Sequence, residues 1–242
     1  MLGLYLEKDE VIQISISVIA ISLALALVFA GRNAPLDSPV EFLVFIAPLF
    51  VTIGSGFILH EMAHKLVAIY YGAAAKFQMW TQGLIFMLVT SLFGVLFAAP
   101  GAVMIFSRSI TKKENAMISL AGPALNVALV FFFVALAFTA PVTQYYSFLL
   151  RLGQIFYGFG ISNGVLNVWH FGAAINLVLA LFNMIPAFPL DGSKVYAWSR
   201  FMWIGVTGAL LFLGIWVIGP EMVINFAFMF AFIIVISKLL FG

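Results

Sequence analysis

An apolar segment at residues 41–72 contains the sequence His60-Glu61-Met62-Ala63-His64. In a helix, residues four apart share one face, so His60 and His64 can reach one metal ion. Glu61 lies beside them, where it can take a proton from a water molecule on that metal. The pattern H-E-x-x-H is typical of zinc metalloproteases. Histidine and glutamate are costly in a bilayer, so their presence here indicates a functional site.

The composition of the 242-residue chain predicts a multi-pass membrane protein. It is 64% hydrophobic and only 8% charged, against roughly 25% charged in soluble domains. Too little polar surface would remain to cover a water-soluble fold, so the expected surroundings are a lipid bilayer. The net charge of +2 and the lack of a long basic run argue against a nucleic-acid partner. The absence of cysteine excludes disulfides and cysteine-ligated zinc.

The apolar segments predict an all-α polytopic fold, and we expect them at about 11–30, 41–72, 84–106, 115–140, 165–186, 201–218 and 221–241. The first is about 20 residues long and follows an acidic stretch, which favours a retained transmembrane helix over a signal peptide.

The segment 84–106 is the difficult one, because it contains Gly94, Pro100 and Gly101. If it enters the membrane and returns, nine basic residues fall on one face, which we place in the cytoplasm: Lys8, Lys65, Lys76, Arg108, Lys112, Lys113, Lys194, Arg200 and Lys238. Only Arg32 and Arg151 then lie on the other face. The sequence therefore predicts about six transmembrane helices, a re-entrant 84–106 with β character, and both termini in the cytoplasm. A full seventh span is the alternative.

A catalytic zinc usually has three protein ligands, and two candidates exist for the third. Asp191 follows two prolines, Pro186 and Pro189, which break the preceding helix and open the backbone. It is the favoured ligand, and the alternative is a helix N-cap for a segment starting near Ser193. His170 precedes Asn183 and Asp191 in the sequence and lies toward the opposite face of the membrane. We therefore expect it to pack at the membrane interface beside Trp169.

Two asparagines in apolar sequence also need partners. Asn126 follows Ala121-Gly122-Pro123-Ala124-Leu125, and Asn183 opens the proline segment. Interhelical hydrogen bonding is one explanation for both. For Asn183 a sharper one is a clamp for the substrate backbone or the oxyanion. We expect Asn183 to be catalytic and Asn126 to contact the substrate.

Three motifs, His60 to His64, Ala121 to Asn126 and Asn183 to Gly192, occur in the order seen in the site-2 protease family of intramembrane zinc metalloproteases. The resemblance covers roughly residues 45–200 of what we expect to be a single membrane-embedded domain, 1–242. It implies that His60, His64 and Asp191 bind one zinc ion per chain and that Glu61 is the catalytic acid–base. It also implies that Asn183 holds substrate or oxyanion. Residues 99–103 resemble the family's β-strand region, where an extended substrate could pair, so the resemblance implies that Pro100 and Gly101 contact the substrate. The compact form is similar to prokaryotic, archaeal-type members.

The predicted function is therefore hydrolysis of peptide bonds in or near the transmembrane helix of a membrane-protein substrate. The predicted location is the cell membrane, with the active site toward the cytoplasm. One alternative is a prenyl-protein endoprotease, whose third ligand would be a glutamate such as Glu114 or Glu221. Another is a non-proteolytic protein that handles metal, such as a transporter or ion pathway built around buried polar residues.

Overall fold

The computed structural model describes residues 6–96, 100–107, 109–151 and 157–241, and within them the chain is mostly helical. The larger helices are α1 (Lys8–Ala30), α3 (Pro39–Leu49), α4 (Ser55–Tyr70), α5 (Thr81–Ser91), α6 (Lys112–Thr139), α7 (Val168–Asn183), α8 (Asp191–Trp198), α9 (Arg200–Val217) and α10 (Pro220–Phe241). A short helix α2 (Ala34–Asp37) precedes α3, and a π-helical turn (Phe50–Gly54) joins α3 to α4.

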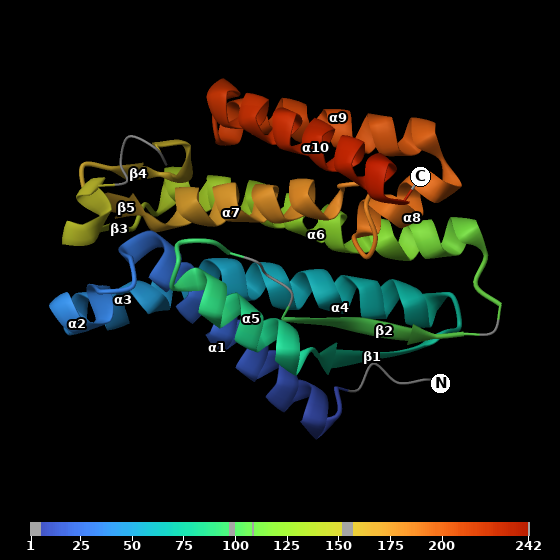
Figure 1. Ribbon diagram of the computed structural model, residues 1–242, viewed down its shortest axis with the longest axis horizontal. Helices are drawn as coiled ribbons and strands as arrows, with labels where there is room; N and C mark the ends of the chain where they lie inside the picture. Colours follow the sequence, from blue (N-terminus) through green and yellow to red (C-terminus); the bar gives the residue numbers. More distant parts are fainter. Residues whose placement is uncertain (1–5, 97–99, 108, 152–156, 242) are drawn as a thin grey trace.

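Two small antiparallel sheets accompany the helices. The first pairs β1 (Ala74–Met79) with β2 (Gly101–Phe106), in a register that sets Phe77 opposite Val103. The second has the order β3-β5-β4, built from Thr143–Tyr145, Val165–Asn167 and Ile161–Ser162. The two sheets lie at opposite ends of the molecule (Figure 1).

Helices α4, α6 and α7 form the centre of the molecule, and their axes are roughly parallel (Figure 1). Helices α9 and α10 cover α7 on one side, while α1, α5 and the β1–β2 sheet lie on the other (Figure 1). The core between these layers is apolar, with fully buried Phe45, Phe171 and Leu177. This arrangement places α8, the β1–β2 sheet and the start of α6 at one end, next to the second half of α4.

Local sequence explains where these elements begin and end. Helix α6 starts at a capping box, in which the Thr111 hydroxyl accepts from the Glu114 amide and the Glu114 carboxylate accepts from the Thr111 amide. Helix α7 ends at Asn183, just before the two prolines, because a proline cannot continue the helical hydrogen-bond ladder. The chain then turns and restarts as α8 at Asp191.

Within the described part of the chain, four helical stretches are long and apolar enough to cross a membrane: Lys8–Ala30, Pro39–Tyr70, Lys112–Thr139 and Arg200–Val217. They correspond to four of the expected spans. The expected segment 165–186 begins instead as strand β5, which leaves α7 with only 16 residues. Large apolar side chains such as Phe201, Phe212 and Trp216 are exposed on α9, as expected where lipid covers a surface.

The segment 84–106 is not one continuous helix. Helix α5 spans 11 residues, about 16 Å of helix and too short to cross a bilayer. Strand β2 follows and pairs with β1, and because Met79 lies opposite Gly101, the chain returns to the place it left. The expected strand region was 99–103, whereas β2 spans Gly101–Phe106. Residues 97–99 lie outside the described part of the chain.

Candidate metal centre

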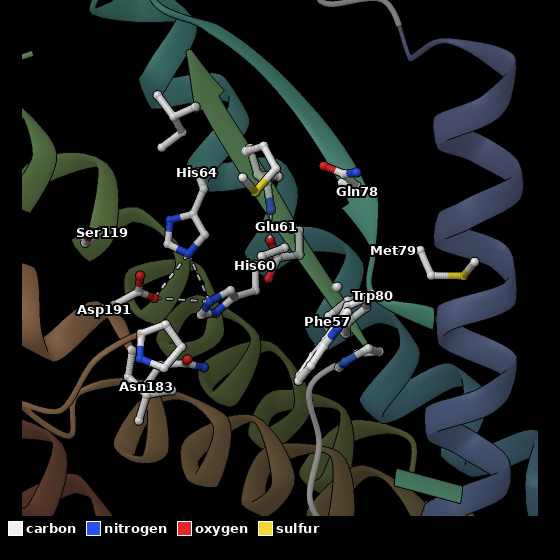
Figure 2. Close-up of a pocket in the computed structure, with 18 of the residues that line it drawn as sticks. Phe57, His60, Glu61, His64, Gln78, Met79, Trp80, Ser119, Asn183 and Asp191 are labelled. Carbon is white, nitrogen blue, oxygen red and sulfur yellow. Dashed lines mark hydrogen bonds and ion pairs between the residues drawn. The ribbon is translucent and has the colours of Figure 1, made fainter. Parts of the chain in front are cut away.

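The side chains of His60, His64 and Asp191 meet at one point between α4 and α8. Their ligand atoms all lie within 4.8 Å of one another, and the three residues are buried. Asp191 Oδ2 is 3.4 Å from His60 Nε2 and 3.1 Å from His64 Nε2 (Figure 2). Two imidazole nitrogens and a carboxylate oxygen that converge in this way match the three-ligand set of catalytic zinc sites.

Hydrogen bonds at the far side of each imidazole ring prepare both histidines to bind metal. His60 Nδ1 is 2.5 Å from the Asn126 side-chain oxygen, and His64 Nδ1 is 2.8 Å from the Ile118 carbonyl oxygen. Both partners are acceptors, so each Nδ1 must carry the proton and donate it. Each Nε2 therefore presents a lone pair, which is the form a metal ligand needs.

Asn126 lies behind His60, in a buried network that joins α4, α6 and α7. Its amide nitrogen donates to Asn176 Oδ1 at 2.9 Å and to the Gly56 carbonyl at 3.3 Å. Asn176 in turn donates to the Gly172 carbonyl at 2.8 Å. Asn126 is fully buried and does not line the cavity described below. We expected Asn126 to contact substrate. Its position instead supports the interhelical alternative, with the added task of holding His60.

Gly122 in α6 lies directly against the ligand nitrogens. A Cβ atom at this position would come within 2.5 Å of His60 Nε2 and 2.6 Å of His64 Nε2. Any side chain here would occupy the space that a bound ion needs. The sequence motif Ala121 to Asn126 thus contributes both a close approach of backbone, through Gly122, and the acceptor for His60.

Asp191 is the first residue of α8, and its carboxylate points at the histidines (Figure 2). Its Oδ2 atom faces the Nε2 atoms of both rings, so the carboxylate and the two imidazoles converge on one point. Lys194, one helical turn later, donates to the Pro189 carbonyl at 2.9 Å and lies 3.4 Å from Asp191 Oδ1. The N-cap position of α8 is Leu190, so the N-cap alternative for Asp191 is not what this helix shows.

Glu61 leans from α4 toward strand β2. Its Oε2 atom accepts a hydrogen bond of 2.8 Å from the Val103 amide, and the side chain is buried. It lies next to His60 and faces the same cavity (Figure 2). The carboxylate is therefore held between the ligand cluster and the edge of the sheet.

A cavity of about 600 Å³ opens onto the ligand cluster. Asn183, Pro100 and Gly101, all expected at the site, line it, together with β2 residues up to Ile105. Asn183 lies close to Asp191 (Figure 2), and its side-chain nitrogen donates to the Leu179 carbonyl at 3.0 Å, which leaves its oxygen and one N–H available. Most of the remaining lining is apolar, as is usual in ligand-binding cavities.

The other candidate ligands lie elsewhere. His170 is half-buried at the start of α7, where its Nε2 lies 3.2 Å from the Gly158 carbonyl oxygen. Glu114 is engaged in the α6 capping box, and Glu221 is exposed at the start of α10. Among the described residues, the one cluster suited to a metal ion combines His60 and His64 with Asp191.

Sequence reasoning missed several contributors to the site. Ile118 and Val103 act through backbone atoms, which leave no side-chain signature. Gly122 contributes a close approach of backbone to the ligand nitrogens, which a sequence motif does not show. Asn176 contributes through its contact with Asn126 on another helix. Glu10 contributes through its contact with the Phe77 amide, 67 residues away.

Comparison with known proteins agrees with this geometry. The family model of peptidase family M50 matches residues 48–204. "Putative zinc metalloprotease MJ0611" of Methanocaldococcus jannaschii is 40% identical over 216 residues, which cover 87% of this chain and 97% of that protein. "Putative zinc metalloprotease Rip3" of Mycobacterium tuberculosis is 30% identical over 145 residues, 58% of this chain and 28% of that protein.

"Zinc metalloprotease MJ0392" of M. jannaschii is 26% identical over 152 residues, 63% of this chain and 34% of that protein. No solved structure gives a significant match. The matched region contains both histidines, Gly122 and Asp191, so the resemblance inferred from the motifs is confirmed. The chain belongs to peptidase family M50, the site-2 protease family of intramembrane zinc metalloproteases.

Proposed function

We propose that this chain hydrolyses peptide bonds in or near the transmembrane helix of a membrane-protein substrate, at a zinc ion held by His60, His64 and Asp191. One observation carries the proposal: the three ligand atoms converge in a cavity that Glu61 and the outer edge of β2 also line. A metal site, a base and a surface for an extended chain are thus found together.

The chain's own residues supply the rest of the chemistry. Zinc in this site would supply Lewis-acid activation of water and of the scissile carbonyl. Glu61 is placed to take the proton of the attacking water and to return it to the leaving amine. Asn183 lines the cavity, and its side-chain amide is our candidate for stabilising the oxyanion. The Asn126 oxygen and the Ile118 carbonyl hold the Nδ1 sides of His60 and His64, so that both Nε2 atoms face the metal position.

Strand β2 is the proposed surface for substrate. The amides of Phe77 and Met79 donate to side chains of α1, so they face away from β2. Their register partners Val103 and Gly101 then face away from β1 and toward the cavity. An unwound substrate segment could add as a strand there. The Val103 amide would pass from Glu61 to the substrate, which would free the Glu61 carboxylate for water.

We further propose six spanning helices, formed by α1, α3–α4, α6, α7, α9 and α10, with α5 and β2 as a re-entrant segment. Basic residues support the orientation. Lys8, Lys76 and Lys112 belong to elements at the end of the molecule that carries the site, whereas Arg32 follows α1 at the opposite end. This bias would place the site toward the cytoplasmic face of the cell membrane.

A panel of model transmembrane substrates, incubated with detergent-purified wild type and Glu61→Gln, tests the proposal directly. We expect cleavage by the wild type alone, with about one zinc per chain in both proteins. Normal cleavage by Glu61→Gln would contradict the role of Glu61. Zinc flux into proteoliposomes without any peptide cleavage would favour a metal-handling protein instead.

A further inference from the structure

Two carboxylates bind the β1–β2 sheet at one cross-strand pair. Phe77 of β1 lies opposite Val103 of β2, and both amides face out of the sheet. The Val103 amide donates to Glu61 Oε2 at 2.8 Å on the cavity side. The Phe77 amide donates to Glu10 Oε1 at 2.8 Å on the α1 side. The sheet is thus held from both edges at the level of the catalytic glutamate.

Lys65 connects the two sides. Its Nζ atom lies 2.7 Å from both carboxylate oxygens of Glu10, and both residues are buried. Lys65 is four residues after Glu61 on α4, so it leaves the same helix one turn later. Helix α4 therefore reaches the outer edge of β2 through Glu61 and the outer edge of β1 through Lys65 and Glu10.

Helix α1 extends this contact along the rest of β1. Gln13 Oε1 accepts from the Met79 amide at 2.8 Å, and Ser17 Oγ donates to the Pro100 carbonyl at 3.2 Å. Glu10, Gln13 and Ser17 are spaced three and four apart, so they share one face of α1. The Glu10 and Gln13 side chains occupy the outer edge of β1, and Ser17 contacts the chain just before β2. This leaves the outer edge of β2 as the one open to a further strand.

We infer that Glu10 is a positioning residue: by accepting from the Phe77 amide it fixes the β1–β2 sheet and so sets where a substrate strand on β2 meets the zinc site and Glu61. This inference rests on the proposed function. The two strands of an isolated pair are only marginally stable, so the register and tilt of β2 depend on what holds its partner. A displacement of about 1 Å at a reacting bond can cost on the order of a hundredfold in rate.

Two double variants separate positioning from charge pairing. Glu10→Gln with Lys65→Met keeps a carbonyl oxygen for the Phe77 amide, and Glu10→Leu with Lys65→Met removes it. Both lack the ion pair, and neither leaves a buried charge alone. We expect kcat per zinc-loaded chain to stay within about threefold of wild type in the glutamine variant and to fall about tenfold or more in the leucine variant, with KM changed much less. Equal kcat values in the two variants would overturn the inference.

Hydrogen exchange of the strand segments 74–79 and 101–106 tests the same point without substrate. We expect about tenfold faster exchange of both strands in the leucine variant than in the glutamine variant, with equal zinc content. Equal exchange would refute the positioning role even if the wild type cleaves. If the leucine variant exchanges faster but the wild type cleaves no substrate, the proposed function would be refuted while the positioning role of Glu10 would stand.

A single substitution guards against failure of the leucine variant to fold. Gln13→Leu removes the acceptor for the Met79 amide and changes no charge. We expect a smaller fall in kcat, about threefold, at unchanged zinc content. A kcat equal to that of the wild type would count against the shared role of this face of α1.

Discussion

Helix α4 is tied to its neighbours by two buried polar networks of opposite character. Toward α6 and α7 the network is neutral, running from His60 through Asn126 to Asn176. Toward α1 and β1 it is charged, running from Lys65 to Glu10 and the Phe77 amide. The Asn126 side chain fixes the ring of a candidate metal ligand, whereas the Glu10 carboxylate fixes a strand through the Phe77 amide. The comparison suggests that metal binding depends on the first network and substrate placement on the second.

The largest effect should come from removing the carboxylate ligand. Asp191→Ala leaves the two histidines without their third partner, so we expect zinc to fall from about one per chain to near zero and cleavage to vanish. Glu114→Ala and Glu221→Ala are the matched controls, since both residues lie away from the cluster. Zinc analysis after gel filtration measures the result. If Glu114 or Glu221 were the third ligand, as in a prenyl-protein endoprotease, zinc would instead be lost in Glu114→Ala or Glu221→Ala and kept in Asp191→Ala.

Asn183→Ala should separate turnover from metal binding. If Asn183 stabilises the oxyanion, kcat should fall about a hundredfold while zinc content is unchanged. Steady-state cleavage with parallel metal analysis gives both quantities. A rise in KM alone would make Asn183 a substrate clamp, and an unchanged kcat/KM would remove it from the site.

Asn126→Leu should do the reverse, because it acts on the neutral network. Loss of the acceptor for His60 Nδ1 should weaken zinc binding about tenfold to a hundredfold. Competition with a chromogenic chelator measures this affinity. The Glu10→Gln variant with Lys65→Met, which alters the charged network, should keep the wild-type affinity. If both networks changed zinc affinity equally, the division of labour drawn above would be wrong.

Gly122→Ala probes the space beside the ligands. Its Cβ would meet His60 and His64 Nε2, so we expect at least about tenfold weaker zinc binding through displaced rings. Gly205→Ala in α9 is a suitable control, because a Cβ there meets nothing within 4 Å. Similar zinc affinities in the two variants would show that α6 can shift to accommodate the methyl group.

The smallest effect should come from the exposed ion pair at the same sheet. Lys76 of β1 lies 2.5 Å from Glu7, and this hydrogen bond raises the pKa of Lys76. A raised lysine pKa stabilises the fold below the usual lysine range and loses that effect as pH rises through it, so the contribution is constant near neutral pH. Because solvent screens the pair, Lys76→Ala should leave the thermal midpoint and kcat unchanged within error. A marked loss would mean that exposed charge also positions the sheet.

The candidate metal ligands could be predicted because their chemistry is carried by side chains. His60 and His64 are recognised by their helical spacing, and Asp191 by its place after Pro186 and Pro189 in apolar sequence; the structure brings the three together. The four long spans follow from apolar runs of sufficient length. The β1–β2 sheet was harder to predict from the sequence, because an apolar strand resembles part of an apolar helix. Its contacts with Glu10 and Glu61 are also made by the backbone amides of Phe77 and Val103, which no residue type reveals. The role of Glu10 depended on a tertiary contact with Lys65, 55 residues away, which no local pattern encodes.

Zinc K-edge X-ray absorption of the zinc-loaded wild type would show directly whether His60, His64 and Asp191 are the zinc ligands. The structure predicts a shell of two imidazole nitrogens from His60 and His64, a carboxylate oxygen from Asp191, and one further light atom. The imidazole count should be unchanged in a His170→Ala variant. A third imidazole that disappears with His170, or a shell that survives Asp191→Ala intact, would contradict the site.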